Sequence, residues 1–274
     1  GNYVAFINQF QLHVAARSHF GAGIDLDAAK PAFAVRRASK VGATYIAWSP
    51  DSESISWSVG AEFKTANINT LMNGNYATPA TGNNLSMQVA HAIPNTAVAL
   101  TNARVITMND ERAVIENATV LIKGNRIESI ARGTAVPEDY TEIDLAGKTI
   151  MPGIIDAHAH GPYAGDDIIP QQNWNLLAHL ALGVTTVHNP SSSAKSAFAA
   201  AEYARTDRIL GPRIFSTGEI VYGAKSTSWA PIDNLDDALA HVRRLAAQGA
   251  ISVKNYNQPR REQRQQVIEA ARQE

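Results

Sequence analysis

The first 63 residues alternate between apolar and polar positions in short runs, the period of a β-strand with one buried face. Such runs lie at 3–7, 11–15, 45–48 and 54–59, and glycine, proline or aspartate separates them. The pattern predicts antiparallel β-structure. From residue 64 to 96 the sequence turns polar and rich in asparagine, which predicts a linker or an extended crossing segment.

A second set of strands is predicted between residues 98 and 150. Its runs lie at 98–108, 118–123, 126–131 and 142–145, and Gly124-Asn125 is a two-residue hairpin signal between two of them. From Ile150 onward, short apolar runs alternate with helical patterns. This alternation predicts strands at 154–158, 184–188, 213–217 and 251–255, followed by helices at 174–182, 194–204, 235–246 and from Pro259.

Strands that alternate with helices form a parallel sheet, because each helix carries the chain back to the start of the next strand. Eight such β/α units in about 250 residues make a barrel. The chain contains four units after Ile150. The predicted fold class is therefore β followed by α/β, with the α/β part forming the first half of a TIM-type (β/α)8 barrel.

The composition narrows the possible functions. Hydrophobic residues make up 45% and charged residues 18%, and 24 Lys and Arg against 25 Asp and Glu give a net charge of −1. Without basic runs there is no electrostatic footprint for nucleic acid, so we expect a small-molecule partner. No stretch reaches the roughly 18 consecutive apolar residues of a membrane span. Zero cysteines exclude disulfides and thiolate metal sites, so a metal would need His, Asp, Glu or Lys ligands.

The segment Tyr45-Ile46-Ala47-Trp48-Ser49-Pro50-Asp51-Ser52 combines an aromatic strand with a tight Ser-Pro-Asp turn. It resembles the blade repeat of WD-like β-propellers of the periplasmic Tol type, in which this turn joins two strands of a four-stranded blade. The resemblance implies C-terminal blades at 1–64 and a linker at 65–97. A propeller usually has four to eight blades, so we expect only its tail end here. It also implies a periplasmic or secreted protein with a signal peptide upstream of Gly1.

The sharpest chemical motif follows the first predicted barrel strand, in the stretch 152–160. Period 2 places Asp156, His158 and His160 on one face of an extended strand. Two imidazoles two residues apart can converge on a divalent cation, and catalytic groups lie at the C-terminal ends of barrel strands. The alternative is a pair of hydrogen-bonded or surface histidines.

This motif, preceded by the strands at 99–108 and 120–127, resembles the amidohydrolase superfamily. In that superfamily a small β-sandwich leads into a barrel whose first strand carries His-x-His. The resemblance implies a sandwich at 98–150 and the first four β/α units of the barrel at 151–274. It further implies that His158 and His160 bind the more buried metal of a site with one or two ions, most often Zn²⁺.

The same resemblance implies a carboxylated lysine that bridges two metals at the end of the fourth strand, and Lys254 takes that position. An ammonium would repel cations, so the role requires the carbamate; the alternative is a lysine that caps the strand with a solvated charge. The superfamily's later ligands, two His and an Asp that acts as general base, would lie beyond residue 274. We therefore expect an inactive fragment.

Two further residues are candidates for substrate contact. His188 ends the second strand at the same rim, where relatives carry an acidic neighbour and this chain has Asn189 instead. Tyr256 lies two residues beyond Lys254 on the same face. For each, a structural role in a loop or in packing is the alternative.

By resemblance, the whole protein would hydrolyse a C–N bond other than a peptide bond through a metal-activated water. The substrate would be an amide, a lactam, a cyclic amide or a dipeptide-like compound. The alternative is a non-catalytic binding or scaffolding protein that combines a propeller with a barrel.

Overall fold

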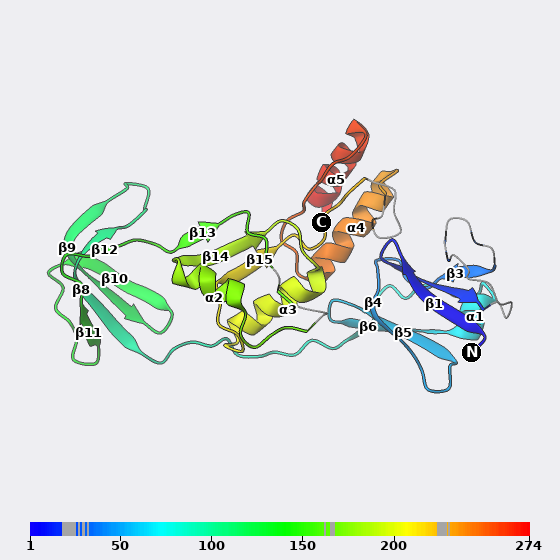
Figure 1. Cartoon of the computed structure of the whole chain (residues 1–274), viewed down its shortest axis with the longest axis horizontal. Helices are drawn as coiled ribbons and strands as arrows, with labels where there is room; N and C mark the ends of the chain where they lie inside the picture. Colours follow the sequence, from blue (N-terminus) through cyan, green and yellow to red (C-terminus); the bar gives the residue numbers. More distant parts are fainter. Residues whose placement is uncertain are drawn as a thin grey trace.

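The computed structural model describes residues 1–17, 26, 28, 31, 33–161, 163–164, 168–223, 229 and 231–274. Three bodies follow one another along the long axis of the molecule (Figure 1). An α/β body (residues 151–274) lies between an N-terminal β-body (1–84) and a second β-body (97–150). None of the described helices combines the length and the apolar character that a membrane crossing requires.

The N-terminal β-body consists of two antiparallel sheets that share one core. The first sheet has the order β1-β2-β3 and the second the order β4-β5-β6-β7. Leu12, Val14 and Trp57 are fully buried where the two sheets meet. The elements are β1 (Tyr3–Asn8), β2 (Gln11–Ala16), β3 (Val35–Arg37), β4 (Thr44–Trp48), β5 (Ser54–Val59), β6 (Glu62–Asn67), α1 (Ile68–Met72) and β7 (Asn83–Asn84).

The Ser-Pro-Asp turn joins β4 to β5 within the four-stranded sheet. Ser49 Oγ donates to Asp51 Oδ1 at 2.5 Å and accepts from the Ser54 amide at 2.9 Å. Asp51 also accepts from the Glu53 amide, and both hydrogen bonds lower the pKa of its carboxyl group. The predicted local geometry is present; a propeller built from such blades stays a prediction.

The predicted linker differs from the structure in its first part. Residues 65–84 belong to the N-terminal β-body, because the strand β6 continues to Asn67, α1 follows it and β7 pairs with β6. The helix begins at Asn67, whose side chain accepts from the Thr70 amide as an N-cap. The connection without regular structure therefore runs from 85 to 96 and contacts the α/β body, where the Ala92 amide donates to the Arg205 carbonyl.

The second β-body is a five-stranded sheet around a small core. Its order is β10-β9-β8-β11, and β12 pairs in parallel with the far end of β8. The hairpin between β9 and β10 turns at Gly124, which has a positive φ of 58° as predicted for this two-residue turn. The strands are β8 (Ala97–Ile106), β9 (Val114–Lys123), β10 (Arg126–Arg132), β11 (Thr141–Asp144) and β12 (Thr149–Ile150).

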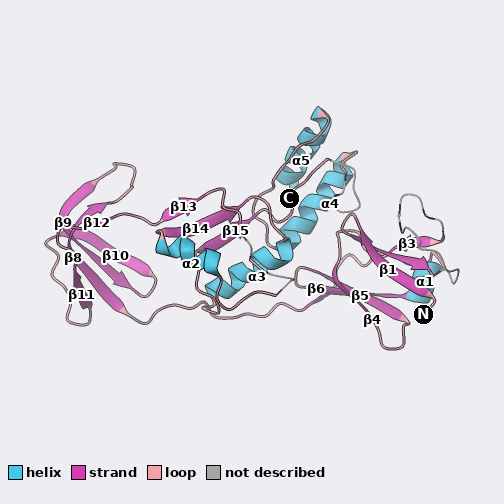
Figure 2. Ribbon diagram, viewed as in Figure 1, coloured by secondary structure: helices cyan, strands magenta, loops and turns pink. Residues whose placement is uncertain are grey.

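The α/β body contains a parallel sheet of order β13-β14-β15 (Figure 2). α2 packs against β14, α3 against β15, and α4 against α5. Asn234 caps α4 through the Asp237 amide and Gly249 ends it in the left-handed region, both as predicted. The elements are β13 (Ile154–Asp156), α2 (Trp174–Ala181), β14 (Val184–Asn189), α3 (Ala194–Arg205), β15 (Arg213–Ser216), α4 (Leu235–Gln248) and α5 (Arg261–Gln273).

Two predictions in this body are wrong in detail. The fourth strand, at 251–255, is reduced to one parallel bridge between Asn255 and Val221. Its backbone pairs with the segment that follows β15 instead of β15 itself: the Val221 amide donates to the Lys254 carbonyl at 2.9 Å. The last helix begins at Arg261 and not at Pro259, because Gln263 accepts from the Arg260 amide and fixes the cap there.

Candidate active site

The two histidines of the His-x-His motif lie just beyond β13. The strand ends at Asp156. The carboxylate of this residue accepts a hydrogen bond of 2.9 Å from the amide of His158, two residues further along the chain, which favours a turn. The period-2 placement of both histidines on the strand was therefore wrong. They nevertheless meet: the ring centroids of His158 and His160 are 5.1 Å apart, the planes cross at 74°, and both side chains are exposed.

His188 connects the two halves of this edge. Its carbonyl accepts from the Ala159 amide at 3.1 Å, between the two histidines of the motif. Its Nε2 lies 2.8 Å from Ser252 Oγ, two residues before Lys254. His188 thus contacts the segment after β13 through its backbone and the 251–255 segment through its half-buried imidazole. Ser252 was not predicted, since a single serine in an apolar run carries no spacing signal.

Lys254 is half-buried on that segment. Its carbonyl pairs with the Val221 amide, and its Nζ lies 5.5 Å from the centroid of the Tyr256 ring. Tyr256 keeps 41% of its surface exposed, and its amide donates to the Val221 carbonyl at 3.0 Å. The structure therefore places Lys254 and Tyr256 together, on a segment that His188 contacts through Ser252.

Asn189 has a structural role. It is 1% exposed, its Nδ2 donates to the Tyr163 hydroxyl at 3.1 Å and its Oδ1 accepts from the Ser191 amide. Burial raises the pKa of Tyr163, and the hydrogen bond from Asn189 opposes that rise. The Asn189 side chain, which stands in place of an acidic residue, makes hydrogen bonds with the buried Tyr163 hydroxyl and with the loop amide of Ser191. This position therefore supplies no charge at the edge.

The side chains of His158 and His160 are of a chemical type that binds divalent cations. Two adjacent imidazoles are ligands that Zn²⁺ accepts readily. Asp156 is engaged with the His158 amide, and the described residues contain no cluster of three or more His, Cys, Asp or Glu side chains. His158 and His160 could supply two ligands, and Lys254 lies on the 251–255 segment that His188 contacts through Ser252.

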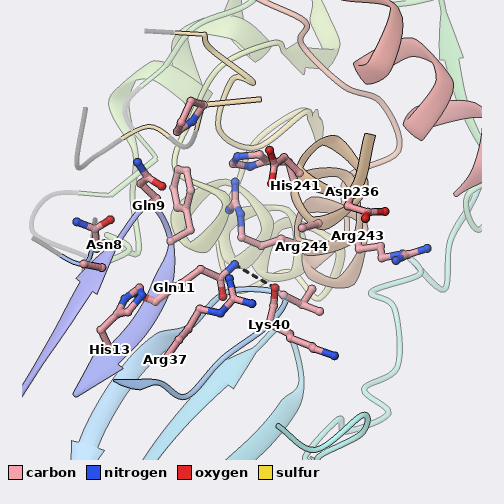
Figure 3. A pocket seen from close by; sticks show the side chains of 16 residues that line it. Asn8, Gln9, Gln11, His13, Arg37, Lys40, Asp236, His241, Arg243 and Arg244 are labelled. Carbon is pink, nitrogen blue, oxygen red and sulfur yellow. Dashed lines mark hydrogen bonds between the residues drawn. The ribbon is translucent and has the colours of Figure 1, made fainter. Parts of the chain in front are cut away.

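Two cavities lined by described residues differ in their relation to this edge. The one beside His160, also lined by Tyr163 and His179, measures about 10 Å³, enough for one water molecule. A cavity of about 680 Å³ lies elsewhere, between the β1–β2 turn and α4 (Figure 3). None of the predicted site residues lines it.

Comparison with known proteins gives partial matches. No family model matches the chain. It is 38% identical over 64 residues to an imidazolonepropionase of Arthrobacter sp., covering 23% of this chain and 16% of that protein. It is 30% identical over 77 residues to a 5-methylthioadenosine/S-adenosylhomocysteine deaminase of Bacillus thuringiensis, covering 26% of this chain and 18% of that protein.

Solved structures agree on the fold. A prolidase complexed with N-methylphosphonate-L-proline aligns with a TM-score of 0.51 and 21% identity, over 65% of this chain and 54% of that one. A protein described as an amidohydrolase aligns with a TM-score of 0.52 and 19% identity over the same shares. The chain thus spans about half the length of these structures. Over these short segments the chain is similar in sequence to hydrolases of C–N bonds, and over 65% of its length it shares its fold with a prolidase and with the protein described as an amidohydrolase.

Proposed function

We propose that the chain is part of a metal-dependent amidohydrolase that cleaves a C–N bond in a small molecule. The observation that carries the proposal is the pair His158 and His160, whose rings meet 5.1 Å apart at the C-terminal edge of a parallel sheet. Both side chains are exposed, so a cation and a substrate can reach them.

In this proposal His158 and His160 hold one divalent cation, Zn²⁺ by donor type, and Lys254 as its carbamate bridges to a second. A cation held there would polarise the substrate carbonyl and make a water molecule more acidic. His188 is a positioning residue, because it holds the end of β13 and the 251–255 segment together. The remaining ligands and the general base are assigned to sequence beyond residue 274.

The proposed substrate class is an amide, a lactam, a cyclic amide or a dipeptide-like compound. The named activities of the relatives and of the solved neighbour support a C–N bond. We also propose a periplasmic or secreted location, supported by the resemblance of the Ser-Pro-Asp turn to Tol-type blades.

Elemental analysis of purified protein tests the metal site. It compares the chain, a form extended through the eighth barrel strand, and both with His158→Ala and His160→Ala. We expect about two zinc ions per extended chain, as in two-metal hydrolases, and their loss in the double variant. His91→Ala is the matched control, because His91 is an exposed histidine on the 85–96 connection and not at this edge. An extended chain without metal overturns the enzyme proposal and favours a binding or scaffolding role.

A further inference from the structure

Three aromatic side chains gather next to Lys254. The Tyr222 ring lies between the other two: its centroid is 5.5 Å from that of Tyr256, at 53°, and 6.1 Å from that of Trp229, edge-on at 89°. Tyr222 and Trp229 are half-buried, and Tyr256 is 41% exposed. The cluster therefore lies partly at the surface, where a ligand can reach it.

The backbone places Tyr222 and Tyr256 side by side at the proposed catalytic edge. Residues 221–223 and 254–257 run side by side: the Val221 amide bonds to the Lys254 carbonyl, the Tyr256 amide to the Val221 carbonyl, and the Gly223 amide to the Asn257 carbonyl. Gln258 adds a side-chain bond of 2.8 Å to the Val221 carbonyl. Tyr222 and Tyr256 thus stand on neighbouring backbones, and Lys254 shares one of them.

We propose that Tyr222, Trp229 and Tyr256 form a subsite for a planar ring of the substrate. The inference rests on the proposed function and narrows its substrate class to amides that carry an aromatic or unsaturated ring. Such a ring stacks on the exposed Tyr256 face or meets an edge of Trp229, the two arrangements that aromatic pairs prefer. Tyr222 is a positioning residue, because it contacts both of the other rings.

Ligand binding to the full chain, with chelator present, tests the subsite independently of metal. The probes are benzamide and cyclohexanecarboxamide, which share the amide and differ in the planarity of the ring. We expect benzamide to bind more tightly, as measured by ligand-observed NMR titration. Tyr256→Leu should weaken benzamide by about 2- to 12-fold, the usual worth of an aromatic pair, and leave cyclohexanecarboxamide unchanged. Tyr256→Phe should keep the preference.

Trp229→Leu provides a second reading if Tyr256→Leu does not fold, and it should also reduce the preference for benzamide. Trp174→Leu is the matched control, since Trp174 is 79% exposed on α2 and should not affect either probe. Equal binding of the two probes, or an unchanged preference in both Tyr256→Leu and Trp229→Leu, overturns the subsite. Metal content is measured separately on the extended chain. A preference for benzamide together with an extended chain that holds no metal would contradict the proposed function alone. Metal in the extended chain without a preference for benzamide would contradict the subsite alone.

Discussion

His13 on β2 illustrates how burial sets the chemistry of a single residue. The side chain is 8% exposed, its ring stacks on Phe6 at 5.5 Å, and its Nδ1 lies 3.0 Å from the Gln11 carbonyl. Burial lowers the pKa of the imidazole, with Arg37 adding to the effect and the contact with Gln11 opposing it. His13 is therefore neutral in the folded chain at a pH where an exposed histidine is partly charged.

This lowered pKa predicts a pH dependence of stability. The unfolded chain binds a proton at His13 near the ordinary pKa of 6.5, whereas the folded chain resists it. The free energy of unfolding should therefore be highest above pH 6.5 and fall as the pH drops towards the folded pKa, by at most about 1.4 kcal/mol per pH unit. Urea unfolding of wild type and His13→Phe between pH 5 and 8 measures the difference. The same substitution at the exposed His91 is the control, and parallel curves for wild type and His13→Phe contradict the prediction.

At the scale of elements, the ion pair between Arg244 and Glu219 connects α4 with the start of α3, and its arginine also contacts the β1–β2 turn. Arg244 on α4 is 5% exposed, and its Nη1 donates to Glu219 Oε2 at 2.8 Å. Glu219 follows β15 and caps α3, because its Oε1 accepts from the Ala194 amide and the N-cap residue Ser193 makes no such bond. The guanidinium also stacks on Phe10 of the β1–β2 turn, at 3.8 Å from the ring centroid. This cluster links α4, the start of α3 and the N-terminal β-body.

Arg244→Met should destabilise the protein by about 3 kcal/mol. It leaves the Glu219 carboxylate partly buried without its cation, and the cost lies at the low end for buried pairs because that side chain stays 20% exposed. Arg243→Met is the matched control on the same helix. The Arg243 side chain is 51% exposed in its ion pair with Glu274. Loss of this exposed ion pair should lower the free energy of unfolding by less than about 1 kcal/mol. Equal changes in the free energy of unfolding, measured with urea, would show that the cluster adds nothing.

At the scale of the whole molecule, two glycines allow the N-terminal β-body to dock on α4. A Cβ at Gly42 would lie 2.6 Å from Arg244 Cδ, and one at Gly60 only 2.0 Å from the Ala247 carbonyl oxygen. Both glycines have positive φ, so they supply the turn conformation as well as the close approach. Backbone of the β5–β6 turn therefore touches backbone of α4 directly, which fixes the two bodies against each other.

Gly60→Ala should weaken this docking. The added methyl overlaps the Ala247 carbonyl, so the two bodies must shift, at a cost of about 1–3 kcal/mol beyond the backbone strain. Gly74→Ala isolates that strain, since Gly74 also has a positive φ and nothing lies within 4 Å of its Cβ position. Hydrogen exchange of the α4 amides, with urea unfolding, measures the difference. If both variants lose the same stability and α4 exchanges alike, the close contact is not what holds the bodies together.

The sequence predicted elements well and their partners less well. Helices α2 and α4 begin within a residue of prediction, because Asn173 and Asn234 are local caps whose effect needs no distant partner. The prediction of a fourth strand at 251–255 was wrong, because the backbone of that segment bonds to Val221. Val221 is a loop residue whose position depends on the path of the chain after β15. The place of β6, α1 and β7 in the N-terminal β-body was missed for the same reason, since polar residues next to a sheet edge read as a linker.

The sequence by itself determined what is local: the strand and helix periods, the Ser-Pro-Asp turn, the side-chain caps of α2 and α4, and the spacing that brings His158 and His160 together. Only the tertiary structure decided what is distant. It joined His188 to the 251–255 segment through Ser252, set Tyr222 beside Tyr256, and docked the N-terminal β-body on α4. The physical reason is that a cap or a turn is satisfied within a few residues, whereas these contacts join residues more than 30 positions apart. Their geometry depends on how whole elements pack.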